Sequence, residues 1–299
     1  MKITLTGSLG HISKPLTKAL VQDGHAVTVI SSNHERQKAI ETLGATAAIG
    51  SMEDVDFLTK AFIGADIVYL MEPLNAGSYF DKDLDIMAAH NEIGYNYKQA
   101  IEQSGVKRVV HLSSIGAHTN KGVGMLAFHY NVENILKQLP GDVFIKFMRP
   151  VGFYYNMFAF IPTIKTQDAI ISNYGGDSKE PWVSPLDITA VIAEEMQKPF
   201  NGREIRYIAS DEVSPNEVAK ILGEAVGKPG LKWLVIPGEQ MFSGMVAAGM
   251  NLQAAKGLVD MNAGRINNLY EDYNQHKPTL GNVKLKDFAK EFAEVYNQK

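Results

Sequence analysis

The sequence predicts an α/β fold with a doubly wound parallel β-sheet, followed by a smaller C-terminal α/β lobe. Short apolar segments alternate with longer amphipathic ones through the first half of the chain. A connection of about ten residues or more allows the crossover that two parallel strands need. After Pro150, aromatic, Met, Pro and Gly residues become more frequent. We therefore expect a sheet domain at residues 1–150 and a smaller lobe, woven onto the sheet, at residues 151–299.

The first unit of the predicted sheet is a strand, a glycine turn, a helix and a second strand. Its expected parts are strand 2–6, turn 7–13, helix 15–24 and strand 26–30. Gly7 permits a sharp turn, and Gly10 lets the backbone approach a pyrophosphate, which the free N–H groups and dipole of the next helix attract. The unit therefore predicts a dinucleotide site. The alternative is a turn between strand and helix that carries two glycines and binds no phosphate.

The same alternation continues along the chain. Further helices are expected at 34–43, 53–63, 80–104 and 123–138, with strands at 45–49, 66–70, 107–112 and 143–148. In the second lobe we expect a strand at 203–208, a helix at 215–226, a flexible Met-rich helical segment at 240–259 and an amphipathic helix at 285–296. Ligands of such sheets lie beyond the carboxyl ends of the strands, so the turns there are the candidate site.

Composition excludes several classes of site. The chain has 299 residues, no cysteine and a net charge of −4. Disulfides, thiolate catalysis and a Cys-type metal site are therefore excluded, and His111 and His118 lack a third ligand at metal spacing. Without a basic run, binding to nucleic acid or to an anionic membrane has little support. The N-terminus shows no signal peptide and no apolar run reaches membrane-spanning length, so we expect a cytoplasmic protein.

Several motifs carry a resemblance to a known family. They are residues 6–10, residues 105–114, Glu133, residues 148–150 with Asn156, and residues 184–188. With them the chain resembles the atypical short-chain dehydrogenase/reductases, specifically the NmrA-like family, over nearly its whole length. Residues 126–129 with Glu133 and Leu136 are most similar to the NADPH:quinone oxidoreductase branch. The resemblance implies an extended Rossmann fold, NAD(P) binding and a small C-terminal substrate lobe. Members include quinone and isoflavone-type reductases, and redox sensors that bind the dinucleotide without turnover.

The chain departs from the catalytic pattern of the common dehydrogenases. The third glycine of the turn is Ser13, which is small enough to keep helix and strand packed. Counting back from Glu133 places the family's catalytic lysine at His129 and its tyrosine at Met125. Since Met125 cannot donate a proton, ordinary ketone reduction is disfavoured. A quinone leaves a hydroquinone anion whose conjugate acid has a pKa of about 10, which water or a neutral donor can protonate.

The candidate catalytic residue is His129, with an unperturbed pKa of about 6.5; a half-buried helix residue satisfied by water is the alternative. The expected cofactor-binding residues follow the strand ends and are Gly7, Ser8, Leu9, Gly10, His11, Ile12, Ser31, Ser32, Asn33, Arg36, Met71, Glu72, Pro73, Ser113, His129, Pro150, Val151 and Gly152. An apolar, aromatic substrate pocket is expected from Met125, Phe153, Tyr154 and Tyr155. For the aromatic residues, a place in the core is the alternative.

The second strand predicts NADP(H) rather than NAD(H). Proteins of this fold that prefer NAD place a carboxylate near its end, where it accepts from the ribose 2′-hydroxyl. Here the position falls in residues 31–33, whose side chains can donate hydrogen bonds to a 2′-phosphate. Arg36 follows, and related NADP binders carry a basic residue at the place of His11. The nearby Glu35 opposes this assignment, and Arg36 as a solvated helix residue is its alternative.

These observations predict an NAD(P)H-dependent oxidoreductase that transfers hydride to a small molecule, a quinone or similar conjugated carbonyl. The competing prediction is a non-catalytic NADP(H)-binding sensor that signals through a protein partner, which the replacement of both Tyr and Lys favours. An isomerase or epimerase is a third and weaker alternative, because it too needs a tyrosine base.

Overall fold

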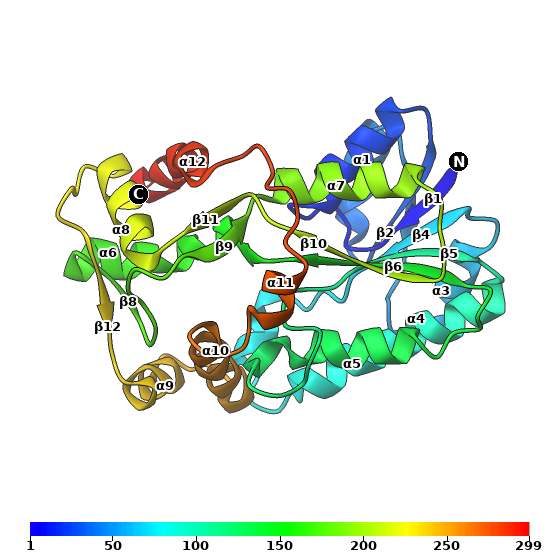
Figure 1. The fold of residues 1–299 in the computed structure, drawn as a ribbon. Coiled ribbons are helices and arrows are strands. Elements are labelled where there is room, and N and C mark those ends of the chain that lie inside the picture. Colours follow the sequence, from blue (N-terminus) through cyan, green and yellow to red (C-terminus); the bar gives the residue numbers. More distant parts are fainter. Residues whose placement is uncertain (299) are drawn as a thin grey trace.

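The computed structural model describes residues 1–298, and its centre is a seven-stranded parallel sheet (Figure 1). The strand order is β10-β6-β5-β4-β1-β2-β3, and every neighbouring pair is parallel. The strands are β1 (Lys2–Leu5), β2 (Ala26–Ser31), β3 (Thr46–Ile49), β4 (Ile67–Leu70), β5 (Arg108–Leu112), β6 (Phe144–Pro150) and β10 (Arg203–Ile208). The predicted doubly wound fold is confirmed.

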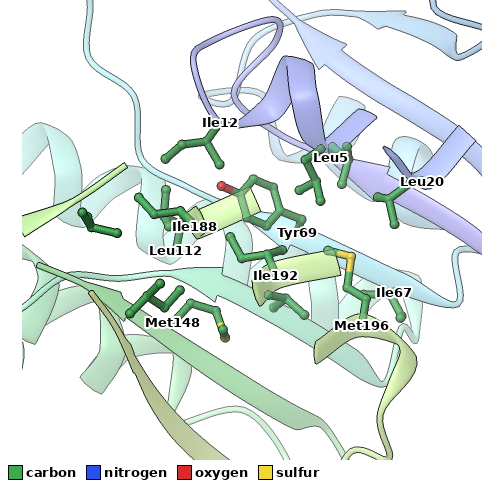
Figure 2. Packing of buried hydrophobic residues seen from close by; sticks show 14 of the residues in the cluster. Leu5, Ile12, Leu20, Ile67, Tyr69, Leu112, Met148, Ile188, Ile192 and Met196 are labelled. Atoms are coloured by element: carbon green, nitrogen blue, oxygen red, sulfur yellow. The ribbon is translucent and has the colours of Figure 1, made fainter. Parts of the chain in front are cut away.

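Helices cover both faces of this sheet because its strands are apolar on both sides. In β5, Val109 packs in the cluster beneath one set of helices and Val110 in the cluster beneath the other. Figure 1 shows α1 (Ser13–Gln22) and α7 (Pro185–Gln197) on one face. The opposite face carries α3 (Val55–Phe62), α4 (Ile86–Ser104) and α5 (Ala127–Leu136), while α2 (Gln37–Thr42) lies before β3. Figure 2 shows the α7 side, where Ile188 and Ile192 approach Tyr69.

The second lobe has two small sheets of its own. One is β11 (Asp211–Val213), β9 (Glu180–Val183) and β7 (Gly152–Phe153), and the other is β12 (Lys232–Val235) with β8 (Ala169–Ser172). Its helices are α6 (Ile161–Gln167), α8 (Pro215–Ala225), α9 (Gly238–Ala247), α10 (Leu252–Arg265), α11 (Glu271–Gln275) and α12 (Leu285–Asn297). A separate apolar core joins α8 and α12 around Trp182. However, α7 and β10 return to the first sheet, so the chain after Pro150 contributes to both parts.

Element bounds differ from expectation where local capping decides them. Helix α4 begins at Ile86 and not at residue 80, because the side chain of Asp85 caps it by accepting from Ala88 N at 3.0 Å. The single helical segment expected at 240–259 is two helices, α9 and α10. They are separated at Gly249, whose φ is +90°, and Asn251 caps α10. Among residues 1–298, no helix combines the length and apolarity needed to cross a membrane.

Candidate functional site

The glycine turn between β1 and α1 is packed on one side and open on the other. Gly7 has a φ of +84°, and a Cβ placed on it would lie 2.3 Å from Met71 Sδ. A Cβ on Gly10 would meet only Gly7 O, at 3.4 Å. At the third glycine position, Ser13 donates its hydroxyl to Thr6 O at 3.2 Å. Gly7 therefore serves the fold, while Gly10 leaves the helix N-terminus accessible to an anion.

The end of β2 carries hydroxyl groups and no carboxylate. The buried Ser31 hydroxyl accepts from Ser8 Oγ at 2.9 Å and from Asn33 N at 3.2 Å. The Asn33 side chain accepts from Glu35 N at 2.8 Å. The side chains of Ser31 and Asn33 already take part in hydrogen bonds within the protein. The exposed side chains of Ser32 and Arg36 are therefore more available to donate to a ligand at the end of β2.

A cavity of about 600 Å³ adjoins the glycine turn. Its lining is Leu9, Gly10, His11, Lys14, Pro15, Lys18, Arg36, Leu43, Tyr155 and Leu186. Sequence reasoning missed Lys14 and Lys18, although their four-residue spacing on the exposed face of α1 was the available signal. Together with Arg36 they give the cavity a cationic wall, which suits a phosphate-bearing ligand.

The residues after β4 lie against the turn and against β5. Met71 N donates to Thr6 Oγ1 at 2.9 Å, and Tyr97 donates its hydroxyl to Met71 O at 2.5 Å. Glu72 is buried and pairs with His111 of β5, whose Nε2 lies 3.0 and 3.1 Å from the two carboxylate oxygens. Of the predicted residues 71–73, Glu72 therefore faces the interior, while Met71 and Pro73 are partly exposed.

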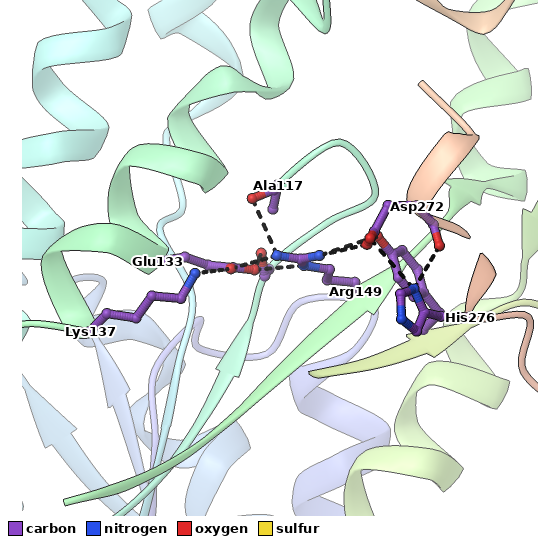
Figure 3. Close-up of polar contacts among 8 residues, drawn as sticks. Ala117, Glu133, Lys137, Arg149, Asp272 and His276 are labelled. Carbon is purple, nitrogen blue, oxygen red and sulfur yellow. Dashed lines mark hydrogen bonds and ion pairs between the residues drawn. The ribbon is translucent and has the colours of Figure 1, made fainter. Parts of the chain in front are cut away.

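The serine that follows β5 contacts a buried ionic network, in which Figure 3 shows Arg149 between Glu133 and Asp272. Ser113 donates its hydroxyl to Glu133 Oε1 at 2.7 Å. Arg149 binds the same carboxylate with two N–H groups, at 2.9 and 2.7 Å, and reaches Asp272 at 3.0 Å. Burial alone would raise the pKa of Glu133, but the Arg149 bonds outweigh it and lower that pKa below its usual value. The Ser113 proton is thus committed to an anion inside the protein.

His129 lies one helical turn before Glu133 on α5 and is partly exposed. Its Nδ1 is enclosed and has no hydrogen-bond partner among the described residues. Burial holds the pKa of His129 well below its usual range, and His111, His90 and Arg149 lower it further. His129 is therefore a neutral imidazole near pH 7, with one donor and one acceptor nitrogen.

The four predicted pocket residues are not gathered in one place. Tyr155 lines the cavity, with its ring 4.4 Å from that of His11. Tyr154 is fully buried in the second lobe and donates to Val283 O at 3.3 Å. Met125 is buried beneath α10, and Phe153 packs partly buried on the core of the first sheet.

The end of β6 completes this edge of the sheet. Pro150 O accepts from Ile115 N at 2.8 Å, and Val151 N donates to Ile208 O at 3.1 Å. Gly152 packs against the indole of Trp182, where an added Cβ would lie 3.2 Å from the ring. Ile12, at the start of α1, is buried, so its side chain belongs to the core. Within residues 1–298, no group of three or more His, Asp or Glu side chains is arranged to hold a metal ion.

The chain is similar to several known proteins over nearly its whole length. A family model described as the NmrA-like family matches residues 1–293. An NAD(P)H azoreductase of Xenophilus azovorans is 22% identical over 249 residues, which are 83% of this chain and 82% of that protein. Among solved structures, an NADPH-dependent quinone oxidoreductase of Escherichia coli, complexed with NADPH, has a TM-score of 0.79 at 19% identity and covers 97% of this chain and 99% of its own. A Citrobacter sp. triphenylmethane reductase complexed with NADP(H) has a TM-score of 0.74 at 18% identity, covering 98% and 100%.

Proposed function

The chain belongs to the NmrA-like family, and we propose that it is an NADP(H)-dependent reductase that transfers hydride to a quinone or a similar conjugated acceptor. One observation carries the proposal: the open face of Gly10 adjoins a cavity whose wall holds Lys14, Lys18 and Arg36. A dinucleotide phosphate is the ligand that such an open helix N-terminus with a cationic wall suits. The names of the similar proteins support the proposal: an NAD(P)H azoreductase, an NADPH-dependent quinone oxidoreductase, and a triphenylmethane reductase complexed with NADP(H).

The residues present fit such a cofactor. Gly10 and the N-terminus of α1 would hold the pyrophosphate, because a side chain at residue 10 would fill the space that it needs. Ser32 and Arg36 would contact the 2′-phosphate, with Lys14 and Lys18 supplying further positive charge. The bound cofactor supplies a hydride, that is, two electrons and one proton. The protein's part is to orient it and to manage the charge that hydride transfer creates on the acceptor.

The conjugated acceptor is inferred from what the site lacks. Met125 stands at the tyrosine position and is buried, and Ser113 donates its proton to Glu133. Neither residue can therefore protonate the strongly basic alkoxide that ketone reduction forms. A hydroquinone-type anion is a far weaker base, with a conjugate acid near pKa 10 as for tyrosine. In this proposal His129, which does not line the cavity at the glycine turn, would donate a hydrogen bond to such an anion as a neutral imidazole.

The test is a turnover assay with purified protein, NADPH and a panel of acceptors, followed by the absorbance of the reduced cofactor. The panel holds small quinones, an azo dye and a simple ketone. Turnover of a quinone well above the rate without protein, with none for the ketone, is expected. Gly10→Val is the control, because it should remove cofactor binding and turnover together. If the protein reduces the azo dye and not the quinones, the proposed acceptor would be an azo compound and not a quinone.

A non-catalytic NADP(H) sensor is the second candidate. It is favoured by the buried carboxylate that holds Ser113, and by the count back from Glu133, which assigns the tyrosine and lysine positions to Met125 and His129. Calorimetric titration with NADPH separates the two functions. Tight binding without turnover of any acceptor in the panel would support the sensor.

A further inference from the structure

Strand β10 forms one edge of the seven-stranded sheet, and its outer side is open. Its neighbour in the sheet is β6, in a parallel pairing. At one end of this pairing, Gly202 O accepts from Ile145 N at 2.9 Å. At the other end, Ile208 O accepts from Val151 N at 3.1 Å, so the even-numbered residues direct their backbone groups toward β6. The N–H and C=O groups of residues 203, 205 and 207 therefore point away from the sheet, and in the described part of the chain they form no backbone hydrogen bond on that side.

The open part of this edge ends near the carboxyl end of the strand. Gly281 N donates to Ala209 O at 2.8 Å, so the C-terminal segment covers the position just after β10. Beside residues 205–207, a hollow of about 370 Å³ separates the strand from residues 272–279. Ile205 lines this hollow and is 49% exposed. An open strand edge with an exposed apolar side chain is a template for pairing with another strand.

Two opposite charges stand two residues apart on one face of β10. Arg206 points to the α7 side, where its Nη1 donates to Glu195 Oε1 at 2.7 Å. Glu204 shares this face because side chains alternate along a strand, and its Oε2 lies 3.8 Å from Lys146 Nζ. The side chains of Arg206 and Glu204 are 39% and 44% exposed, so contacts within the chain enclose neither charge. Ile205, between them, points to the opposite face.

A second copy of this strand fits the open edge in an antiparallel register with a twofold axis at Ile205. The outward N–H and C=O groups of Ile205 then bond the same groups of Ile205 in the second copy. Each Glu204 lies directly opposite Arg206 of the second copy, and the twofold axis repeats this pair. Positions 204 and 206 form non-hydrogen-bonded pairs, whose Cα atoms are about 4.5 Å apart, so the opposite charges are close enough to attract each other.

The same charges disfavour the neighbouring registers. A twofold axis at Glu204 would place it opposite Glu204 of the second copy, and an axis at Arg206 would place two arginines opposite each other. Like charges directly opposite are destabilising. Pairing cannot extend far beyond Tyr207, because Gly281 N already occupies Ala209 O. The strand therefore offers one short, self-complementary register centred on Ile205.

We propose that β10 pairs with β10 of a second copy of this chain, so that a twofold dimer carries one continuous sheet through both copies. The pairing is independent of the proposed function, because residues 203–207 do not line the cavity at the glycine turn. On the α5 side, Arg203 of the second copy lies opposite Tyr207, beside the hollow that Asp272 also lines. The dimer thus covers Ile205 and brings opposite charges together on both faces of the strand.

Cross-linking tests the register directly, because the chain has no cysteine that could interfere. In the proposed dimer the two Cα atoms of residue 205 are about 5.5 Å apart, a separation that a disulfide can span. Ile205→Cys should therefore form a covalent dimer with oxidised glutathione at least tenfold faster than Ile266→Cys, an exposed control position at the end of α10. Equal rates in the two variants would overturn the proposed register.

Charge reversal tests the two ion pairs by analytical ultracentrifugation. Arg206→Glu places carboxylates opposite each other at both pairs, and we expect the dimer dissociation constant to rise at least tenfold. Adding Glu204→Arg to the same chain restores opposite charges with exchanged signs, so the dissociation constant should return to within about threefold of wild type. Thermal unfolding checks that both variants are folded. A dissociation constant unaffected by Arg206→Glu would contradict the pairing.

A third variant leaves every ion pair of β10 in place. Ile205→Lys puts two ammonium groups at the twofold axis, on an exposed side chain, and should give a monomer. Ile266→Lys is the matched control and should keep the dimer. A dimer that persists in Ile205→Lys would overturn the proposal. A wild type that stays monomeric up to its solubility limit would also overturn it, and the charges of β10 would then serve to protect an open edge against pairing.

Discussion

The glycine turn and the end of β5 lie on the same edge of the sheet and are built in opposite ways. Around Gly10 the site is formed by backbone and remains open, with lysines and an arginine at its wall. Around Ser113 it is formed by charged side chains that bond one another and are buried. Dinucleotide binding needs only the first arrangement, which survives the loss of any one side chain. The second arrangement holds its protons inside the protein, where Ser113 donates to Glu133 and Arg149 pairs with the same carboxylate.

The largest effect should come from breaking the buried network. Glu133→Ala leaves Arg149 with Asp272 as its remaining anionic partner, and we expect the free energy of unfolding to fall by about 3–5 kcal/mol. Lys137→Ala, which removes the part-exposed partner of the same carboxylate, should cost less than about 1 kcal/mol. Urea unfolding of both variants measures the difference. If both variants lost the same free energy of unfolding, the buried network would stabilise the protein no more than a surface ion pair does.

The same network should make the free energy of unfolding decrease as pH falls into the acid range. The pKa of Glu133 is lower in the folded protein than in an unfolded chain, where it is about 4.3. Its contribution is therefore fully present above about pH 4.3 and is lost as pH falls through the lower folded value. Urea unfolding between about pH 5 and pH 2 should show a weaker acid dependence in Glu133→Gln than in wild type. The same slope in both would assign the acid sensitivity to other carboxylates.

The next effect concerns the open half of the site. Gly10→Val should lower NADPH affinity at least tenfold, about 1.4 kcal/mol, with the fold retained, because a Cβ there meets only Gly7 O. Gly7→Ala is the contrasting variant. Its Cβ would strike Met71 and its φ is positive, so stability should fall before affinity does. Calorimetry and thermal unfolding separate the two, and normal NADPH binding by Gly10→Val would mean that the phosphate lies elsewhere.

Cofactor choice should respond to the cationic wall. Wild type should bind NADPH at least tenfold more tightly than NADH, since one charge-assisted phosphate contact contributes roughly 1.5–3 kcal/mol. Arg36→Ala should remove most of this difference by weakening NADPH alone. Lys232→Ala, an exposed lysine of β12 outside the cavity lining, should leave it intact. Calorimetric titration with both reduced cofactors measures the preference, and equal or tighter binding of NADH by wild type would contradict it.

The two regions also differ in how much of their structure the sequence predicts. Local patterns predicted the strands and the glycine turn, because a strand, two glycines and a helix determine them within about twenty residues. The pairing of Glu72 with His111 spans 39 residues and depends on the register of β4 and β5. Periodicity carries no information on such contacts. Tyr154 and Tyr155 are the same residue in adjacent positions, yet only one lines the cavity, since the 3₁₀ turn at 154–160 decides their directions.

The smallest effect is expected where family resemblance would suggest a large one. The family resemblance includes residues 105–114, and Ser113 is one of the residues expected to bind the cofactor, but its hydroxyl donates to Glu133 and is buried. Its proton is thus used within the protein, and Ser113→Ala should change quinone turnover less than threefold at saturating NADPH. Ser113→Thr, which keeps the donor, is the matched comparison. A loss of a hundredfold or more in Ser113→Ala, with turnover kept in Ser113→Thr, would show that the serine leaves Glu133 during the reaction. In that case Ser113 would become accessible to the ligand during the reaction. The region at the end of β5 would then be closed only in the resting protein, and the contrast with the open glycine turn would hold only there.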